Sequence, residues 1–225
     1  MSMRIEELKI YTQKLEEQTE FYKNVLGLKL LGKSHDQVTF KMGESILKIT
    51  YSATAQPYHF AINIPSNKEL ESLEWLKQRL DILKDGDSEI VDFVSWNAKA
   101  IYFYDADQNI VELIARKNLN NTSNVVFDQD SFLEISEIGM PTTNIEDKFT
   151  QLNTKCELEI FDGSFERFCA IGDENGLFIS INKEIKKWFP TNELAYSSNF
   201  ETIIMVKENR YKVDFKDDRL FVDSY

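Results

Sequence analysis

The sequence predicts an α+β fold built from tandem βαβββ units. Short segments of alternating apolar and polar residues, the period of half-buried strands, occur in groups of three along the chain. A further strand pattern and a helical pattern precede each of the first three groups. This order recurs at a roughly constant interval, and one such unit cannot cover its own sheet, so the units are expected to pair.

The first unit opens with the alternating residues 7–12, which predict a strand. A helical pattern follows and places Leu15, Tyr22 and Leu26 on one face. It ends at Gly27, where a left-handed cap favours a residue without a Cβ. Three short strands are expected to complete the unit, over residues 28–33, 37–42 and 45–51.

The second unit repeats this order. Residues 59–64 predict a strand, and a capping box from Ser66 to Glu69 opens a helix. Three further strands are expected over residues 89–94, 99–104 and 110–115. The Asn- and Thr-rich residues 119–124 have the composition of a linker. We therefore predict two domains, residues 1–118 and 126–225.

The third unit begins with a strand from Phe132 to Met140 and a helix that starts near Thr143 and ends at Leu152. Its remaining strands are predicted over residues 157–161, 167–171 and 177–181. The tail shows three strand patterns, residues 201–206, 211–215 and 220–222, without a helical pattern. It is expected to be a fourth unit that lacks its helix. The third unit can pair within its own chain or across a homodimer.

Composition excludes several classes of partner. A formal net charge of −12 and the lack of a dense basic cluster argue against nucleic acid and anionic membrane surfaces. No segment approaches the roughly 18 apolar residues that span a bilayer, and residues 1–9 lack a signal-peptide pattern. A cytoplasmic protein is therefore expected. Cys156 and Cys169 have neither a CxxC nor a zinc-site spacing and are expected to be reduced strand residues.

Two segments resemble motifs of the vicinal oxygen chelate superfamily, which includes glyoxalases, extradiol dioxygenases and bleomycin-resistance proteins. Glu20–Leu28, with the sequence EFYKNVLGL, is similar to the helix-end motif of the family. Asp105–Leu113, with the sequence DADQNIVEL, is similar to its turn and closing strand. The resemblance covers residues 4–117 well and residues 132–182 weakly. It implies curved mixed sheets around a cleft that binds a small molecule.

The resemblance also implies where metal ligands lie, namely on the first and last strands of each unit. In the first two units these positions hold Glu7, Lys48, His59 and Glu112. Glu7, His59 and Glu112 are therefore the expected metal ligands, and Lys48, which cannot bind a metal while protonated, is expected in the same cleft.

In the third unit the corresponding positions hold Glu137 and, by the same comparison, Ser180. With only one acid, this unit is not expected to bind a metal. Gly139, Phe168, Phe178 and Trp188 instead suggest an apolar pocket or a packing surface.

The alternation of residues 59–64 supports a polar cleft. His59 and Asn63 fall on the side opposite the apolar residues of that strand, so both are expected to face the cleft. Glu112 interrupts an almost continuous apolar strand, and a buried carboxylate needs a compensating partner. That partner can be a divalent metal shared with His59 and Glu7, the ammonium of Lys48, or a proton.

These alternatives lead to different functions. A Zn, Mn, Fe or Ni ion suits a glyoxalase-like lyase or isomerase acting on a small oxygen-chelating metabolite, with Glu7 or Glu112 moving a proton. A Lys48–Glu112 ion pair suits a metal-free binding protein of the bleomycin-resistance type. Ring cleavage by an extradiol dioxygenase has less support, because the chain contains only two histidines, His35 and His59.

Overall fold

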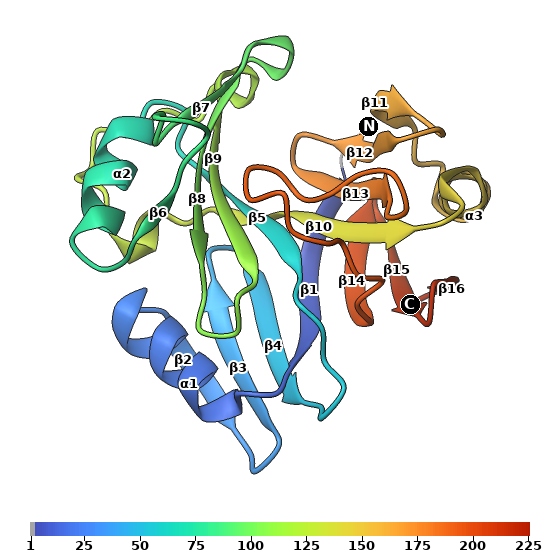
Figure 1. Cartoon of the computed structure of the whole chain (residues 1–225), viewed down its shortest axis with the longest axis horizontal. Helices are drawn as coiled ribbons and strands as arrows, with labels where there is room; N and C mark the ends of the chain where they lie inside the picture. Colours follow the sequence, from blue (N-terminus) through green and yellow to red (C-terminus); the bar gives the residue numbers. More distant parts are fainter. Residues whose placement is uncertain (1–2) are drawn as a thin grey trace.

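The strands form two large sheets in the computed structural model, which describes residues 3–225 (Figure 1). The seven-stranded sheet has the order β16-β15-β14-β1-β4-β3-β2. The nine-stranded sheet has the order β11-β12-β13-β10-β5-β9-β8-β6, with β7 also paired to β8. The predicted α+β fold of repeated units is confirmed.

Each unit contributes its elements in the predicted order, with one additional two-residue strand in the second unit. The first comprises β1 (Met3–Thr12), α1 (Leu15–Glu20), a π-helical turn η1 (Phe21–Val25), β2 (Lys29–Lys33), β3 (Gln37–Met42) and β4 (Ser45–Tyr51). The second comprises β5 (His59–Ile64), α2 (Glu69–Lys77), β6 (Ile82–Leu83), β7 (Val91–Phe93), β8 (Ala98–Tyr104) and β9 (Ile110–Arg116). The third comprises β10 (Glu134–Thr142), α3 (Ile145–Cys156), β11 (Ile160–Ser164), β12 (Phe168–Asp173) and β13 (Gly176–Asn182). The tail comprises β14 (Phe200–Val206), β15 (Asn209–Lys216) and β16 (Arg219–Ser224), which follow one another without a helix among the described residues.

Some boundaries differ from those predicted. The helix expected to end at Leu152 continues to Cys156, and Glu157 ends it with a positive φ of 58°. Cys156 is therefore a helix residue and not a strand residue. The strand predicted over residues 89–94 is reduced to Val91–Phe93, because a 3-10 turn, η2 (Val94–Trp96), follows it directly.

The units pair in a nested order. Antiparallel pairing of β1 with β14 joins the first unit to the fourth, and antiparallel pairing of β5 with β10 joins the second unit to the third. The third unit therefore pairs within its own chain. Both sheets cross the predicted boundary between residues 1–118 and 126–225, and that division stays a prediction.

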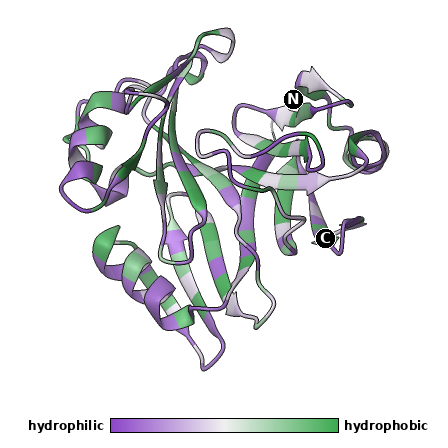
Figure 2. Ribbon diagram, viewed as in Figure 1, coloured by the Kyte–Doolittle hydropathy of each residue, from purple (hydrophilic) through white to green (hydrophobic). Residues whose placement is uncertain are grey.

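The two sheets differ in how completely their residues are buried. One apolar cluster lies between the sheets and the helices and includes Leu8, Phe60 and Phe178. A second cluster covers the opposite face of the nine-stranded sheet and includes Ala61 and Trp188. Every residue of β5 and β9 is consequently buried, whereas β3 and β4 alternate between buried and partly exposed residues. Figure 2 shows the mixture of hydrophilic and hydrophobic residues along β1 and β4.

No helix among residues 3–225 combines the length and the apolar character that crossing a membrane requires.

Candidate metal centre

Three strands of the nine-stranded sheet bring His59, Glu112 and Glu137 together. In the parallel β5–β9 pair, Ala61 lies opposite Glu112, and in the antiparallel β5–β10 pair Ala61 lies opposite Glu137. Neighbours in register point to the same face of a sheet, as do residues two apart on one strand. The two acids therefore flank the small side chain of Ala61 on the face that also carries His59.

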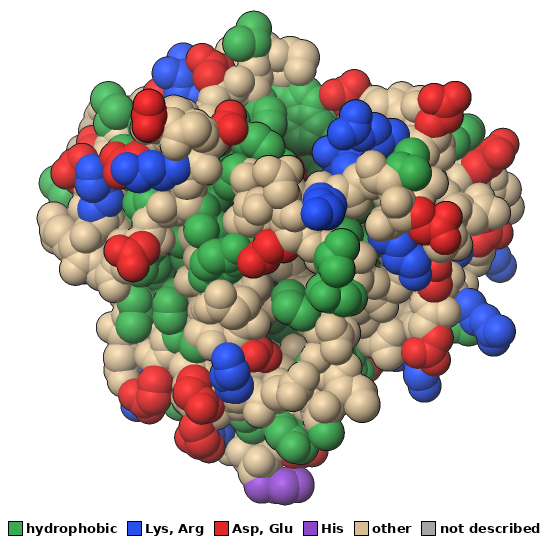
Figure 3. All heavy atoms as spheres, in the orientation of Figure 1, with side chains coloured by type: hydrophobic (Ala, Val, Ile, Leu, Met, Phe, Trp, Pro, Cys, Tyr) green, Lys and Arg blue, Asp and Glu red, His purple; other side chains and the backbone are tan. Residues whose placement is uncertain are grey.

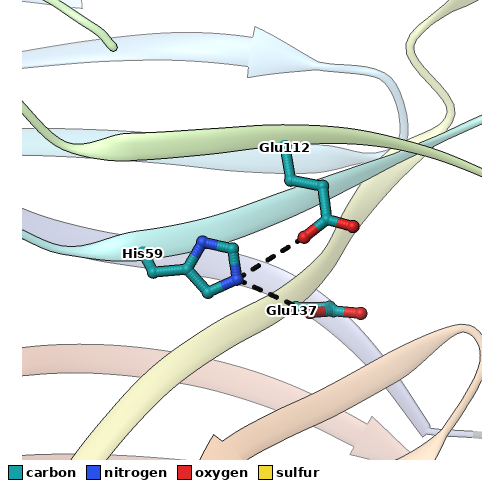
Figure 4. A group of neighbouring side chains, drawn as sticks. All are labelled: His59, Glu112 and Glu137. Atoms are coloured by element: carbon teal, nitrogen blue, oxygen red, sulfur yellow. Dashed lines mark ion pairs between the residues drawn. The ribbon is translucent and has the colours of Figure 1, made fainter. Parts of the chain in front are cut away.

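The three side chains converge at their functional atoms (Figure 4). His59 Nε2 lies 3.5 Å from Glu112 Oε2 and 3.8 Å from Glu137 Oε2. One ligand atom from each residue can be chosen so that all three lie within 4.8 Å of one another. The residues are almost fully buried, with exposed fractions of 6% for His59, 2% for Glu112 and 3% for Glu137.

The orientation of the imidazole is set by a backbone group. His59 Nδ1 lies 3.1 Å from the carbonyl oxygen of Ile110. A carbonyl can only accept, so Nδ1 carries the hydrogen and donates it. In the neutral imidazole, Nε2 then directs its lone pair towards the two acids, which is the tautomer that a metal ligand needs.

Arg116 fixes the position of the Glu137 carboxylate. This arginine, the last residue of β9, is fully buried, and its Nη2 donates a hydrogen bond to Glu137 Oε1. Its Nε donates to Asn63 Oδ1 at 3.1 Å, while Asn63 Nδ2 donates to Glu134 Oε1 at 2.6 Å. Glu137 thus has one oxygen fixed by a guanidinium and the other facing His59.

The site concentrates negative charge in a dry environment. Burial and the nearby carboxylate of Glu137 raise the pKa of Glu112 to about 8, although His59 and Arg116 act in the opposite direction. Burial lowers the pKa of His59, but Glu137 and Glu112 outweigh it and the net shift is upward. The arrangement therefore favours taking up a cation or a proton.

A divalent metal ion fits these donors. One imidazole nitrogen and two carboxylate oxygens are a donor set used for Zn, Mn, Fe and Ni. Two ligands of one tetrahedral ion lie about 3.4 Å apart when each bond is about 2.1 Å. The separations of 3.5 and 3.8 Å from His59 Nε2 are close to that value, and Arg116 supplies the outer contact that fixes Glu137.

The structure corrects the expected ligand set at one position. Glu7 and Lys48 lie on the seven-stranded sheet, where Lys48 Nζ forms an ion pair with Glu7 Oε1 at 2.7 Å. Their side chains are 29% and 31% exposed. Neither shares a site with His59, because the first unit pairs with the fourth and not with the second. Lys48 therefore does not neutralise Glu112, and Glu137 takes the place expected for Glu7.

A second correction concerns the last strand of the third unit. Since Glu137 pairs with Leu177 as His59 pairs with Ile110, the counterpart of Glu112 is Ile179 and not Ser180. Ile179 faces the site, whereas the buried hydroxyl of Ser180 donates to the carbonyl of Met140 at 3.2 Å. The fourth ligand position is thus occupied by an apolar side chain.

Asn63 also has a different role from the one expected. Its amide is fully buried and bonded to Arg116 and Glu134, and it does not line the pocket above the three ligands. It supports the guanidinium that fixes Glu137.

A pocket of about 340 Å³ opens above the three candidate ligands. Trp188 and Phe168, which the sequence suggested for an apolar pocket, both line it. Phe178 instead packs in the apolar core on the other face of the sheet. The full lining is His59, Phe93, Ser95, Trp96, Tyr102, Glu112, Glu137, Asp162, Phe168, Ile179, Ile181, Lys186, Trp188 and Phe189.

Gly139 makes room for one wall of this pocket. A Cβ at Gly139 would lie 2.7 and 2.8 Å from two ring carbons of Trp188. We expect Gly139→Ala to displace the indole, to shift the tryptophan emission and to lower the free energy of unfolding by about 1–3 kcal/mol. Urea denaturation measures the last effect. Gly32→Ala is the matched control, because its Cβ would meet no atom within 4 Å. Equal behaviour of the two variants would contradict the role of Gly139.

The comparisons with known proteins agree with this architecture. Residues 4–113 match the sequence model of the Glyoxalase/Bleomycin resistance protein/Dioxygenase superfamily. A search of curated proteins returned no match. A lactoylglutathione lyase from Agrobacterium tumefaciens matches 48% of this chain and 90% of its own, with 22% identity and a TM-score of 0.40.

Two solved structures match 99% of the chain. One is a candidate dioxygenase from Bacillus subtilis, of which 85% is covered, with 13% identity and a TM-score of 0.62. The other is a point variant of glyoxalase I from Zea mays, of which 92% is covered, with 14% identity and a TM-score of 0.58. At these identities the likeness shows the fold. Residues 4–113 therefore carry the sequence pattern of the Glyoxalase/Bleomycin resistance protein/Dioxygenase superfamily, as the resemblance to the vicinal oxygen chelate superfamily implied, and the chain as a whole shares the fold of these two solved structures.

Proposed function

We propose that the protein is a metal-dependent enzyme, a lyase or isomerase of the glyoxalase type that acts on a small oxygen-chelating metabolite. The observation that carries this proposal is the buried convergence of His59, Glu112 and Glu137 at the floor of a pocket. Arg116 compensates one of the two buried carboxylates, and a divalent ion would compensate the other.

His59 Nε2, Glu112 Oε2 and Glu137 Oε2 are the atoms that would hold the ion. A divalent metal there would polarise the oxygens of a chelating substrate. Ile179 has no donor atom, so the three residues would leave the ion open to a substrate oxygen. The metals that suit this set are Zn, Mn, Fe and Ni.

The side chains of Glu112 and Glu137 are not held equally firmly, and we assign them different roles for that reason. Glu137 is bonded to Arg116 through one oxygen and is suited to a fixed ligand role. Glu112 accepts no hydrogen bond from Arg116, so it is the acid better suited to leave the ion and move a proton. Tyr102 lies opposite Glu112 across the β8–β9 pair and lines the pocket. Burial and Glu112 raise the pKa of Tyr102, so its hydroxyl stays protonated and can donate to a substrate oxygen.

Metal binding by purified protein tests the proposal. After removal of bound metal, calorimetric titration with Zn²⁺ or Mn²⁺ is expected to show about one equivalent bound, and Glu137→Gln is expected to weaken binding by at least about 100-fold. Glu7→Gln is the matched control, because Glu7 lies on the other sheet in an ion pair with Lys48. The proposal fails if the wild type binds no divalent metal, or if the Glu7 variant loses as much affinity as the Glu137 variant.

A metal-free binding protein is the second candidate function. The aromatic lining of the pocket favours this function, because aromatic side chains can bind a flat compound without catalysing a reaction. Ligand-induced thermal stabilisation that is unchanged by a chelator would favour this candidate over the enzyme.

A further inference from the structure

The walls of the pocket are largely aromatic. Six of the residues around it are aromatic, and they come from four parts of the chain: Phe93, Trp96, Tyr102, Phe168, Trp188 and Phe189. Several of these rings contact one another, as shown by centroid separations of 5.7 Å for Tyr102–Phe189 and 6.3 Å for Trp96–Phe168. Flat surfaces of this kind gain most from a flat apolar ligand. The volume of about 340 Å³ suits a molecule with one or two fused rings.

Lys186 places a positive charge on this apolar lining. The residue lines the pocket and is partly buried, and its Nζ lies 5.7 Å from the centroid of the Phe168 ring. Within residues 3–225 no carboxylate lies within 4.0 Å of this ammonium. Burial and the neighbouring Arg167 lower the pKa of Lys186, as expected for a cation that lacks a partner.

Among the described residues, none of the acids that line the pocket lies within 4.0 Å of the Lys186 ammonium. Asp162 lines the pocket, but its Oδ2 accepts a hydrogen bond from Trp96 Nε1 at 2.6 Å and its Oδ1 accepts one from the amide of Gly163 at 2.7 Å. Glu112 and Glu137 lie at the floor with His59. Figure 3 shows hydrophobic side chains in a hollow at the upper part of the molecule, with Lys and Arg side chains gathered on one rim.

We infer that the pocket takes a flat, apolar molecule that carries a carboxylate, with the carboxylate bound by Lys186 and the opposite end over His59, Glu112 and Glu137. In the metal-free protein the charges favour this direction, because the carboxylates of Glu112 and Glu137 repel the anion while Lys186 attracts it. The assignment of Lys186 as the anion-binding group is made for the metal-free protein. Only the statement that the far end carries chelating oxygens rests on the proposed function.

Two ligands of nearly equal shape test this inference on the full chain in the presence of a chelator. 2-Naphthoate carries the carboxylate, and 2-naphthamide is its neutral counterpart. Calorimetric titration is expected to show naphthoate binding at least about tenfold more tightly, since a charge-assisted hydrogen bond is stronger than a neutral one. Lys186→Met is expected to abolish this preference while the affinity for naphthamide stays unchanged.

Two further variants separate the charge from general effects on the fold. Lys187→Met removes an exposed ammonium next in sequence and is expected to keep the preference of the wild type. Lys186→Arg keeps a cation in the pocket lining and is expected to retain most of the preference for naphthoate. The inference is overturned if neither compound binds, if naphthoate is not preferred, or if the preference survives in Lys186→Met.

Metal binding and the preference for naphthoate can fail independently of each other. If the preference depends on Lys186 but the wild type binds no divalent metal, the enzyme proposal fails and the carboxylate inference stands. If metal binds as proposed but the preference is missing, only the inference about Lys186 fails.

Discussion

Replacement of Arg116 by methionine is expected to lower the free energy of unfolding by about 3–5 kcal/mol, which is the usual cost of breaking a buried ion pair by removing one partner. Arg116 is fully buried and bonds both Glu137 and Asn63. Its loss leaves the carboxylate of Glu137 without a cation in the interior. Urea denaturation of the metal-free protein measures the change.

Two controls define the origin of this effect. Arg219→Met removes an exposed guanidinium and is expected to change stability by less than about 0.5 kcal/mol. The double variant Arg116→Met with Glu137→Gln removes both charges and is expected to recover a substantial part of the loss. If the double variant were as unstable as the sum of the single ones, the Arg116–Glu137 pair would not be the source of the stability.

The metal-free protein is expected to lose stability as the pH rises from about 5 to above 8. The pKa of Glu112 is raised in the folded protein from 4.5 to about 8, by burial first and by Glu137 second. A carboxyl group with a raised pKa contributes stability that is fully present below its unfolded value and is lost as the pH rises through its folded value. The upward shift of His59 acts in the same direction. Because each pKa unit corresponds to about 1.4 kcal/mol, the loss amounts to a few kcal/mol.

Unfolding by urea at a series of pH values, with a chelator present, measures this dependence. Glu112→Gln is expected to flatten it, because the amide does not titrate. Added divalent metal is expected to reverse the trend, since it binds the deprotonated ligands. A stability that rises with pH in the chelated wild type, or an unchanged slope in Glu112→Gln, would contradict the assignment to this site.

The repeated units were predictable because their evidence is local. Alternating strands, helical faces and turn residues lie within a few tens of residues of one another, and the chain forms them in the predicted order. The boundary near Glu157 was less visible, because its cap is a non-glycine residue with a positive φ.

Only the candidate ligands that belong to the same unit could be predicted from the sequence to lie together. His59 and Glu112 belong to the first and last strands of the second unit, which pair directly. Glu137 reaches them through the pairing of two units, and nothing in the local pattern states which units pair. One signal pointed to it, namely that Glu137 lies among the apolar residues Ile135, Ile138 and Met140, as Glu112 lies in an apolar strand.

The sequence comparison matched Glu112 with Ser180, whereas the structure matches it with Ile179, one residue earlier. Matching residues between units therefore depends on the strand register. A shift of one residue moves a side chain to the opposite face of a sheet. The weak resemblance of the third unit did not fix the register of β13, whereas the structure fixes it through Glu137 and Leu177.

The nested pairing of the units has a consequence for synthesis on the ribosome. The second and third units are adjacent in the chain and can close their sheet once the third unit has been made, while β1 must wait for β14 before it gains its second neighbour. All three candidate metal ligands lie in the pair that closes first. We therefore expect the candidate metal centre to take shape during translation while the N-terminal strand still has one open edge.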